Sequence, residues 1–212
     1  DDKIAWYEND GSESFTEHAI STSADGAYTV RAADVDADGD MDVLSASFND
    51  DKIAWYENDG SESFTEHAIS TSADGAYTVR AADVDADGDM DVLSASFNDD
   101  KIAWYENDGS ESFTEHVIST SADYANSVYA VDVDSDGDMD VLSASYSDDK
   151  IAWYEQEGSP VQTTFQPQTT EALQTAVDLW VSDSASAVAA YGQINTWDVS
   201  LITDMSELFQ SK

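Results

Sequence analysis

A nine-residue acidic string, Asp-x-Asp-x-Asp-Gly-Asp-x-Asp, occurs three times in this chain of 212 residues. The copies span residues 34–42, 83–91 and 132–140. In each copy, carboxylates stand at positions 1, 3, 5 and 9, a glycine stands at position 6, and position 7 offers a backbone carbonyl. Ca²⁺ prefers such hard oxygen donors and takes about 6 to 8 of them at roughly 2.3 to 2.6 Å. The pattern therefore predicts three calcium-binding loops.

The residues around these loops distinguish them from EF-hands, which place a bidentate Glu at position 12 between two helices. Position 12 is Ser45, Ser94 or Ser143 here. The flanking segments, such as 28–33 and 43–48, are short and rich in β-branched and aromatic residues, as strands are. Each loop is therefore predicted to join two strands. A solvated acidic turn is the alternative, because Asp and Gly are common turn formers, but three copies at fixed spacing favour the calcium site.

The loops belong to a longer internal repeat. Residues 1–49 and 50–98 are identical, 99–147 is a third copy with a few changes, and a partial fourth copy covers 148–159. Each full unit contains four strand-like runs. One set of four, which begins in the second copy and ends in the third, covers 77–83, 92–97, 101–106 and 113–119. Turn residues such as Asn107-Asp108-Gly109 separate the runs. Four antiparallel strands in about 40 to 50 residues match the size of a β-propeller blade.

The combined pattern resembles a known repeat family. Asp-Val-Asp-x-Asp-Gly-Asp-Met-Asp-Val-Leu, with Ile-Ala-Trp-Tyr-Glu-Asn-Asp-Gly nearby, is similar to FG-GAP/VCBS repeats, which form calcium-bearing blades of integrin α-type propellers in extracellular proteins. The resemblance covers roughly residues 1–159. The literal Phe-Gly-Gly-Ala-Pro sequence is absent, which places the chain nearer the VCBS-like branch and leaves integrin-style ligand recognition unsupported.

This resemblance implies the metal ligands and their number. We expect about one Ca²⁺ per loop, three in all, held by the aspartates of the three copies. These are Asp34, Asp36, Asp38, Asp40, Asp42, Asp83, Asp85, Asp87, Asp89, Asp91, Asp132, Asp134, Asp136, Asp138 and Asp140.

The predicted fold is mainly β, with tandem four-stranded antiparallel blades forming a partial propeller. The run at Lys3–Glu8 reads as the third strand of a blade, so we expect a half blade, two full blades and a unit of three strands. Propellers close with about 4 to 8 blades. We therefore expect either a segment of a longer protein or copies that associate to complete the architecture.

After residue 159 the composition changes, and we expect a linker over 160–168 and a small, incomplete α-containing segment over 169–212. Leu173, Ala176, Val177, Trp180 and Val181 recur at helical spacing. Further on, Ile194-Asn-Thr-Trp-Asp-Val-Ser-Leu resembles the repeat of BspA-type, leucine-rich-repeat-like surface proteins.

Composition limits the partners. With 46 acidic and 7 basic residues the formal charge is −39, so nucleic acid, whose phosphates require Lys and Arg, is not expected. No apolar run approaches the roughly 20 residues that span a bilayer, so membrane insertion is not expected either. The chain has no cysteine and so cannot form disulfides. We expect an extracellular or cell-surface location, where bound calcium would stabilise the fold in place of disulfides.

Other repeated residues are less persuasive as functional sites. Trp6, Trp55, Trp104 and Trp153 suit sugar stacking, but we expect them to be core residues. His18, His67 and His116 lie in plain strand patterns, and no metal or catalytic role is expected for them. Near-identical copies argue against an enzyme, because an active site needs one differentiated pocket.

We therefore expect a calcium-binding structural or adhesive repeat segment of a large, possibly filamentous surface protein. Its expected partners are calcium, other copies or segments of the same protein, and other surface proteins or glycans. A lectin-like, glycan-binding propeller module is the alternative. A polysaccharide-cleaving enzyme is the least favoured, because Arg31 and Arg80 are the only arginines and Tyr129 replaces them in the third repeat.

Overall fold

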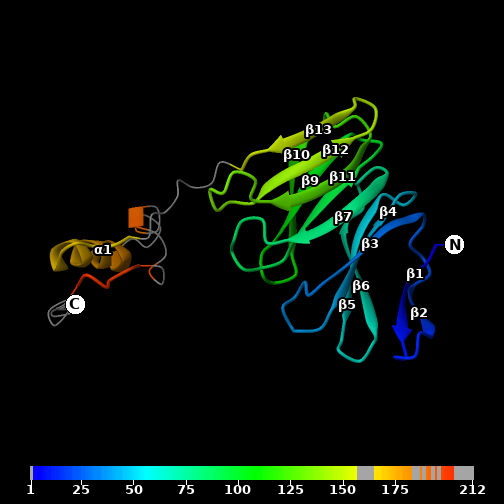
Figure 1. Cartoon of the computed structure of the whole chain (residues 1–212), viewed down its shortest axis with the longest axis horizontal. Helices are drawn as coiled ribbons and strands as arrows, with labels where there is room; N and C mark the ends of the chain where they lie inside the picture. Colours follow the sequence, from blue (N-terminus) through cyan, green and yellow to red (C-terminus); the bar gives the residue numbers. More distant parts are fainter. Residues whose placement is uncertain are drawn as a thin grey trace. The chain divides into compact units, whose positions relative to one another are not determined.

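The computed structural model describes residues 2–156, 165–182, 187, 190, 191, 194 and 197–202. The chain divides into two compact units, Asp1–Gln156 and Glu157–Lys212. The first unit is built from β-strands and the second contains a helix (Figure 1).

The strands of the first unit follow one another with the period of the sequence repeat. They are β1 (Ile4–Asn9), β2 (Phe15–Ser21), β3 (Ala27–Ala33), β4 (Asp42–Ser47), β5 (Lys52–Asn58), β6 (Phe64–Ser70), β7 (Ala76–Ala82), β8 (Asp91–Ser96), β9 (Lys101–Asn107), β10 (Phe113–Ser119), β11 (Ala125–Val131), β12 (Asp140–Ser145) and β13 (Lys150–Tyr154). The strand-like runs expected from the sequence are confirmed, with ends that shift by one residue or so.

Neighbouring strands in the sequence pair antiparallel to make separate sheets. In chain order these are a two-stranded sheet β1-β2, four-stranded sheets β3-β4-β5-β6 and β7-β8-β9-β10, and a three-stranded sheet β11-β12-β13. The predicted half blade, two full blades and three-stranded unit are therefore confirmed, and the described strands form no closed barrel.

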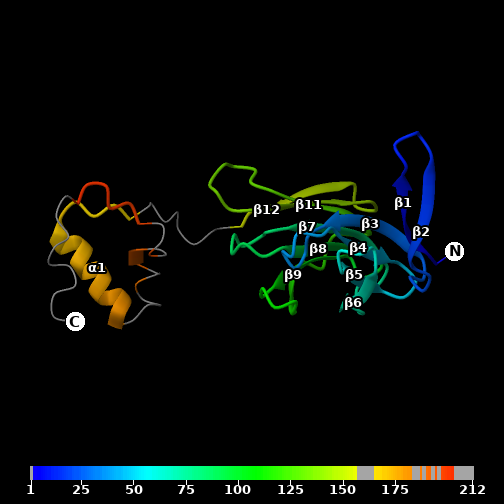
Figure 2. The ribbon, with the colours of Figure 1, turned by 90° about the horizontal axis from the view of Figure 1, so that it is seen from below.

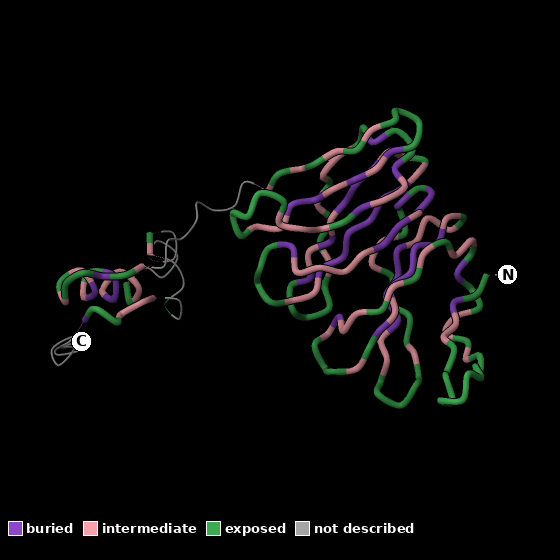
Figure 3. Tube along the Cα trace, in the orientation of Figure 1, coloured by how far each residue is buried: buried purple, intermediate pink, exposed green. Residues whose placement is uncertain are grey.

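The sheets stack on faces that recur in every repeat. The front face of a sheet carries the Leu and Ala of its second strand and the Ile and Trp of its third strand. The back face carries the Val of its first and second strands and the Ala and Tyr of its third strand. In the main core cluster, Leu44, Ala46, Ile53 and Trp55 from one front face pack with Val79, Val92, Ala103 and Tyr105 from the next back face. Figure 3 shows buried segments inside the sheets and exposed turns at their ends.

The first strands of consecutive sheets lie side by side, which Figure 2 shows for β3, β7 and β11. The Thr29 hydroxyl donates to the carbonyl of Tyr77 at 2.6 Å, and the Thr78 hydroxyl donates to the carbonyl of Asn126 at 2.7 Å. The equivalent threonine of two successive repeats thus makes the same link to the next sheet.

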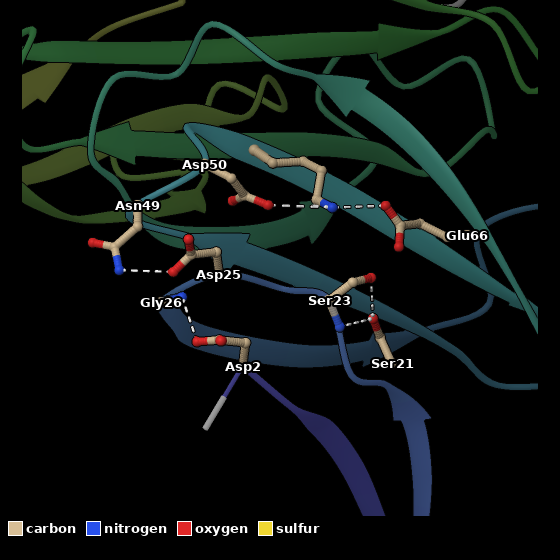
Figure 4. Close-up of polar contacts among 9 residues, drawn as sticks. Asp2, Ser21, Ser23, Asp25, Gly26, Asn49, Asp50 and Glu66 are labelled. Atoms are coloured by element: carbon tan, nitrogen blue, oxygen red, sulfur yellow. Dashed lines mark hydrogen bonds and ion pairs between the residues drawn. The ribbon is translucent and has the colours of Figure 1, made fainter.

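The turns before β3 and after β4 add polar contacts (Figure 4). They lie at the opposite end of these strands from the acidic loop, which follows β3 and precedes β4. Asn49 donates to Asp25 at 2.9 Å, and the backbone N–H of Gly26 donates to Asp2 at 3.5 Å. In the same region Lys52 forms ion pairs with Asp50 at 3.3 Å and with Glu66 at 2.7 Å. These contacts hold the segments between sheets in place.

The second unit contains α1 (Thr170–Ser182), which confirms the predicted helix. The Thr169 hydroxyl caps its start by accepting a hydrogen bond from the N–H of Ala172 at 3.2 Å. Leu173, Ala176 and Val177 are buried, whereas Val181, near the end of the helix, is exposed. Most of the predicted linker at 160–168 and of the BspA-like stretch from 194 to 209 lies outside the described residues.

Candidate metal centres

Each acidic loop joins the first and second strands of a sheet, as the sequence predicts. The loop at 34–42 connects β3 to β4, and its counterparts connect β7 to β8 and β11 to β12. Gly39 has a φ of 98°, and a Cβ added there would meet no atom within 4 Å. Glycine is therefore needed at position 6 for its backbone conformation and not for space.

The last aspartate of each loop anchors the loop to the sheet. Asp42 is fully buried, and its two carboxylate oxygens accept backbone N–H groups from Val35 at 2.9 Å and from Asn58 at 2.8 Å. Asp91 accepts the equivalent bonds from Val84 and Asn107 at 2.9 and 2.8 Å. One carboxylate thus fixes the start of the loop, the start of a strand and the next hairpin.

Carboxylates from separate loop positions converge on one point in every copy. Their oxygen atoms lie within 4.8 Å of one another in each group. The groups are Asp34, Asp36 and Asp42; Asp83, Asp85 and Asp91; and Asp132, Asp134 and Asp136. Carboxylates placed this close repel one another unless a cation lies between them.

The first two groups contain an oxygen that the protein itself does not satisfy. Asp34 Oδ2 accepts the N–H of Gly39 at 3.2 Å, but Asp34 Oδ1 is buried without a hydrogen-bond donor among the described residues. Asp83 repeats this arrangement, with Oδ2 bonded to Gly88 at 3.2 Å and Oδ1 buried and unpartnered. Buried carboxylate oxygens are normally paired, and a cation bound at this point would supply the missing partner. The donor set of these two loops therefore fits a hard divalent ion.

The electrostatics of position 3 point the same way. Burial, together with the charges of Asp87 and Asp91, raises the pKa of Asp85 above its ordinary value. Burial likewise raises the pKa of Asp36, with contributions from Asp42 and its other carboxylate neighbours. Ionised carboxylates in this position are therefore disfavoured until positive charge is brought near.

The third loop differs in detail. Asp132 Oδ1 accepts the N–H of Ser135 at 2.6 Å, and Asp136 takes the place in the group that Asp42 has in the first copy. Ser135 replaces the alanine found in the other two loops. This loop therefore satisfies more of its own oxygen atoms.

The carboxylates at positions 5 and 7 of the first loop lie outside its group. Asp38 Oδ1 accepts the N–H of Asp40 at 2.8 Å. The Asp40 side chain lies against Gly60 of the β5–β6 hairpin, where an added Cβ would collide with its carboxylate. Gly60 was not foreseen as a site residue, although the recurrence of Asn-Asp-Gly at the ends of β1, β5 and β9 was a signal for it.

The recurring histidines and tryptophans have packing partners. His67 stacks on Trp55 with ring centroids 4.6 Å apart and pairs with Glu57 at 2.8 Å. Trp55 is fully buried, which confirms its predicted core role, whereas Trp153 is 46% exposed. The core prediction is wrong for Trp153 because no further sheet covers that face within the described part of the chain.

The comparisons with known proteins agree with the repeat architecture. A family model described as an FG-GAP-like repeat matches three times, over residues 1–45, 34–94 and 83–143. Every match includes at least one complete acidic loop. No curated protein matches the sequence. In the described residues, no helix has the length and apolarity required to cross a bilayer. By its repeated match to this model, the chain belongs to the FG-GAP-like repeat family.

Proposed function

We propose that this chain is a calcium-binding structural and adhesive repeat segment of an extracellular or cell-surface protein. Two observations at Asp34 and Asp83 carry the proposal. Each has a buried oxygen without a donor among the described residues, and each belongs to a group whose carboxylate oxygens lie within 4.8 Å of one another. Such an arrangement costs free energy without a cation. Two carboxylates at about 4 Å repel by roughly 1 kcal/mol in water and by about 4 kcal/mol at an effective dielectric of 20.

Calcium at these points would stabilise the stacked sheets through the loops. Asp42 already ties its loop to the strand and to the following hairpin, so an ion bound beside Asp42 stiffens all three segments. We retain the five aspartates of each repeat as the proposed ligand set, with the converging group as its centre. Asp38 and Asp40 belong to this set on the family resemblance.

A structural role outside the cell accords with the family and the composition. FG-GAP-like repeats are typically extracellular. The chain has no cysteine, and extracellular calcium modules work with dissociation constants of roughly 10⁻⁴ to 10⁻³ M. We propose residues 1–159 as the repeat segment, 160–168 as a linker and 169–212 as an incomplete BspA-like segment. A non-catalytic role follows, since the repeats are near copies of one another.

Glycan binding is the second candidate, and a row of aromatic rings favours it. Tyr28 and Tyr77 lie 4.0 Å apart between ring centroids, and Phe97 and Tyr124 lie 4.4 Å apart and almost parallel. Tyr28 and Tyr124 are exposed. Aromatic faces suit the apolar side of a sugar ring, and this row is better placed for that contact than the repeated tryptophans.

Isothermal titration of the ion-free chain with Ca²⁺ tests the proposal. We expect about three sites, with Mg²⁺ binding more weakly because it demands tighter octahedral geometry. A chain that shows no saturable heat with Ca²⁺ would contradict the assignment. Titration with soluble polysaccharides, compared with a Tyr28→Ala variant, tests the second candidate.

A further inference from the structure

The stack of sheets in the first unit has an exposed apolar face at each of its two ends. The equivalent faces of the sheets inside the stack are covered by a neighbouring sheet. At the C-terminal end, the front face of the β11–β13 sheet leaves Ile151 78% exposed and Trp153 46% exposed. The equivalent Ile53 and Ile102 are buried under the next sheet. All three strands contain the same Lys-Ile-Ala-Trp-Tyr sequence, so the difference comes from the missing neighbours: the next sheet, and the fourth strand that β5 and β9 have and β13 lacks.

At the other end, the back face of the β3–β6 sheet is only partly covered. Val30 is 47% exposed, whereas the equivalent Val79 and Val128 are buried. The β1-β2 sheet in front of it has only the strands that correspond to β5 and β6. A hollow of about 220 Å³, lined by Ile4, Val30 and their neighbours, lies where further strands would pack.

The two ends match each other strand for strand. Residues 1–8 and 148–155 are identical, so β1 and β13 are the same strand in two places. In the described structure β13 pairs only with β12, which leaves one edge without a partner strand. The strand that would pair there is β2, because its sequence is that of β6, which pairs with β5 in a defined register.

We propose that two copies of this chain close into a ring by exchanging this strand. The ring would contain two junctions, each of which joins the N-terminal end of one copy to the β11–β13 sheet of the other. In each junction, β2 leaves its own β1 and becomes the fourth strand of the partner's β11–β13 sheet. The front face with Ile151 and Trp153 then packs on the back face with Val30, as at the two internal interfaces. The partner surface is thus a continuation of an interface that the chain already builds between its own sheets.

The strand count sets the number of copies. From β2 to β13, the described part of one copy of this chain contributes the strands of three four-stranded blades. Propellers close with about 4 to 8 blades. One copy gives too few and three copies give too many, whereas two copies give a six-bladed ring. Each junction joins a head to a tail, and such contacts close into a ring when the rotation allows it.

Turn contacts inside the chain show how a junction would be tied. The carbonyl of Asp100 accepts the N–H of Ala122 at 3.0 Å, and its carboxylate accepts the N–H of Tyr124 at 2.9 Å. Asp149 has nearly the same φ as Asp100, 52° against 56°. In the ring Asp149 would receive the partner's Ala24 and Gly26, whose bonds to Asp2 are now longer, at 3.3 and 3.5 Å.

The free energies favour exchange under screening conditions. Replacing β1 by the identical β13 costs little, because the pairing with β2 and the contact with the β3–β6 sheet are rebuilt. The net free energy of association comes from burial of apolar surface at Ile151, Trp153 and Val30. A formal charge of −39 on each copy opposes association, so the dimer is stronger at physiological salt than at low salt.

The ring extends the structural role proposed above without depending on bound calcium. Its test is the mass of the 212-residue chain by sedimentation velocity at about 0.15 M salt. We expect twice the chain mass. Ile151→Asp and Val30→Asp, at opposite ends, should each give a monomer. Val117→Asp is the matched control, because Val117 is exposed on β10, away from both open faces, and its variant should remain dimeric.

Mixing the two end variants gives the decisive result. One junction of the mixed pair contains only native faces, so a dimer should reappear although neither variant dimerises alone. A native chain that stays monomeric up to its solubility limit, or a mixture that stays monomeric, would overturn the proposal. Calcium titration of the same variants keeps the two proposals separate, since none of these substitutions touches an acidic loop.

Discussion

At the scale of single residues, the first aspartate of the acidic loop divides its two oxygens between two tasks. Asp83 uses Oδ2 to hold the N–H of Gly88, and this bond shapes the loop. Its other oxygen is buried and has no donor among the described residues. Asp85 and Asp91 add further charge within 4.8 Å. The ion-free loop is therefore stabilised by hydrogen bonds from backbone N–H groups to its carboxylates and destabilised by repulsion among those carboxylates.

Asp83→Asn separates these two effects. The substitution should raise the dissociation constant of the 83–91 loop at least tenfold, about 1.4 kcal/mol, because a charged ligand is lost. It should also stabilise the ion-free protein by about 1 kcal/mol, since repulsion falls. Calcium titration and urea unfolding in chelator measure the two changes. Glu13→Gln, the same charge change in an exposed hairpin, is the control and should leave calcium binding unaltered.

Gly60 and Gly11 form a matched pair for testing Asp40. Both have positive φ, 74° and 79°, but a Cβ at Gly60 would collide with Asp40 while one at Gly11 would meet nothing within 4 Å. Both alanine variants should lose about 1 kcal/mol from backbone strain. Only Gly60→Ala should also weaken calcium binding at the 34–42 loop. Equal calcium affinities in the two variants would remove Asp40 from the proposed ligands.

At the scale of elements, the buried aspartate that ends each loop joins a strand to the hairpin beyond it. Asp91 begins β8 and accepts backbone N–H groups from Val84 and from Asn107 at the end of β9. Asn107 in turn donates to the carbonyls of Val35 and Met90, both at 3.3 Å, so the tie reaches the preceding sheet. The position of the 83–91 loop thus depends on the preceding sheet as well as on its own sheet.

Asp91→Ala should therefore be among the most damaging changes in the first unit. Two buried N–H groups would lose their acceptor, at about 1 to 3 kcal/mol each. Asp91→Asn should cost less, because its carbonyl oxygen still accepts one bond. Urea unfolding of the calcium-free protein gives both free energies. Equal losses for the two variants would contradict the anchoring role.

The elements were the part of this molecule most open to prediction from sequence. Strand ends could be placed within a residue or so, because each run is bounded by Asp, Asn and Gly and the pattern recurs three times. Contacts between distant segments could not. Three such features depend on neighbours that the linear pattern does not specify: the close approach of Asp40 to Gly60, the anchoring by Asp42 and the exposure of Trp153.

At the scale of the whole molecule, excess negative charge is the dominant feature. The acidic residues outnumber the basic ones by 46 to 7, and three bound Ca²⁺ ions would offset only part of the difference. Self-repulsion of this size lowers the stability of a compact state and is reduced by salt. The stacked faces supply the apolar contacts that oppose it.

Salt and calcium should therefore stabilise the protein in overlapping ways. In chelator, the melting temperature should rise as NaCl increases, because screening weakens repulsion between exposed and converging carboxylates. With calcium bound, the same salt series should produce a smaller rise, since the strongest repulsion is already neutralised. Parallel slopes in the two series would show that the loops contribute little to the electrostatic strain.

The central claim is that cations held by the acidic loops stabilise the stacked sheets, and a melting curve against free Ca²⁺ concentration tests it most directly. The melting temperature should climb steadily once calcium exceeds the dissociation constant of the loops, because a ligand that binds only the folded state stabilises it by RT ln(1 + [L]/Kd) per site. At 100 times that constant, each site contributes about 2.7 kcal/mol. A melting temperature that is the same in chelator and in saturating calcium would contradict the account.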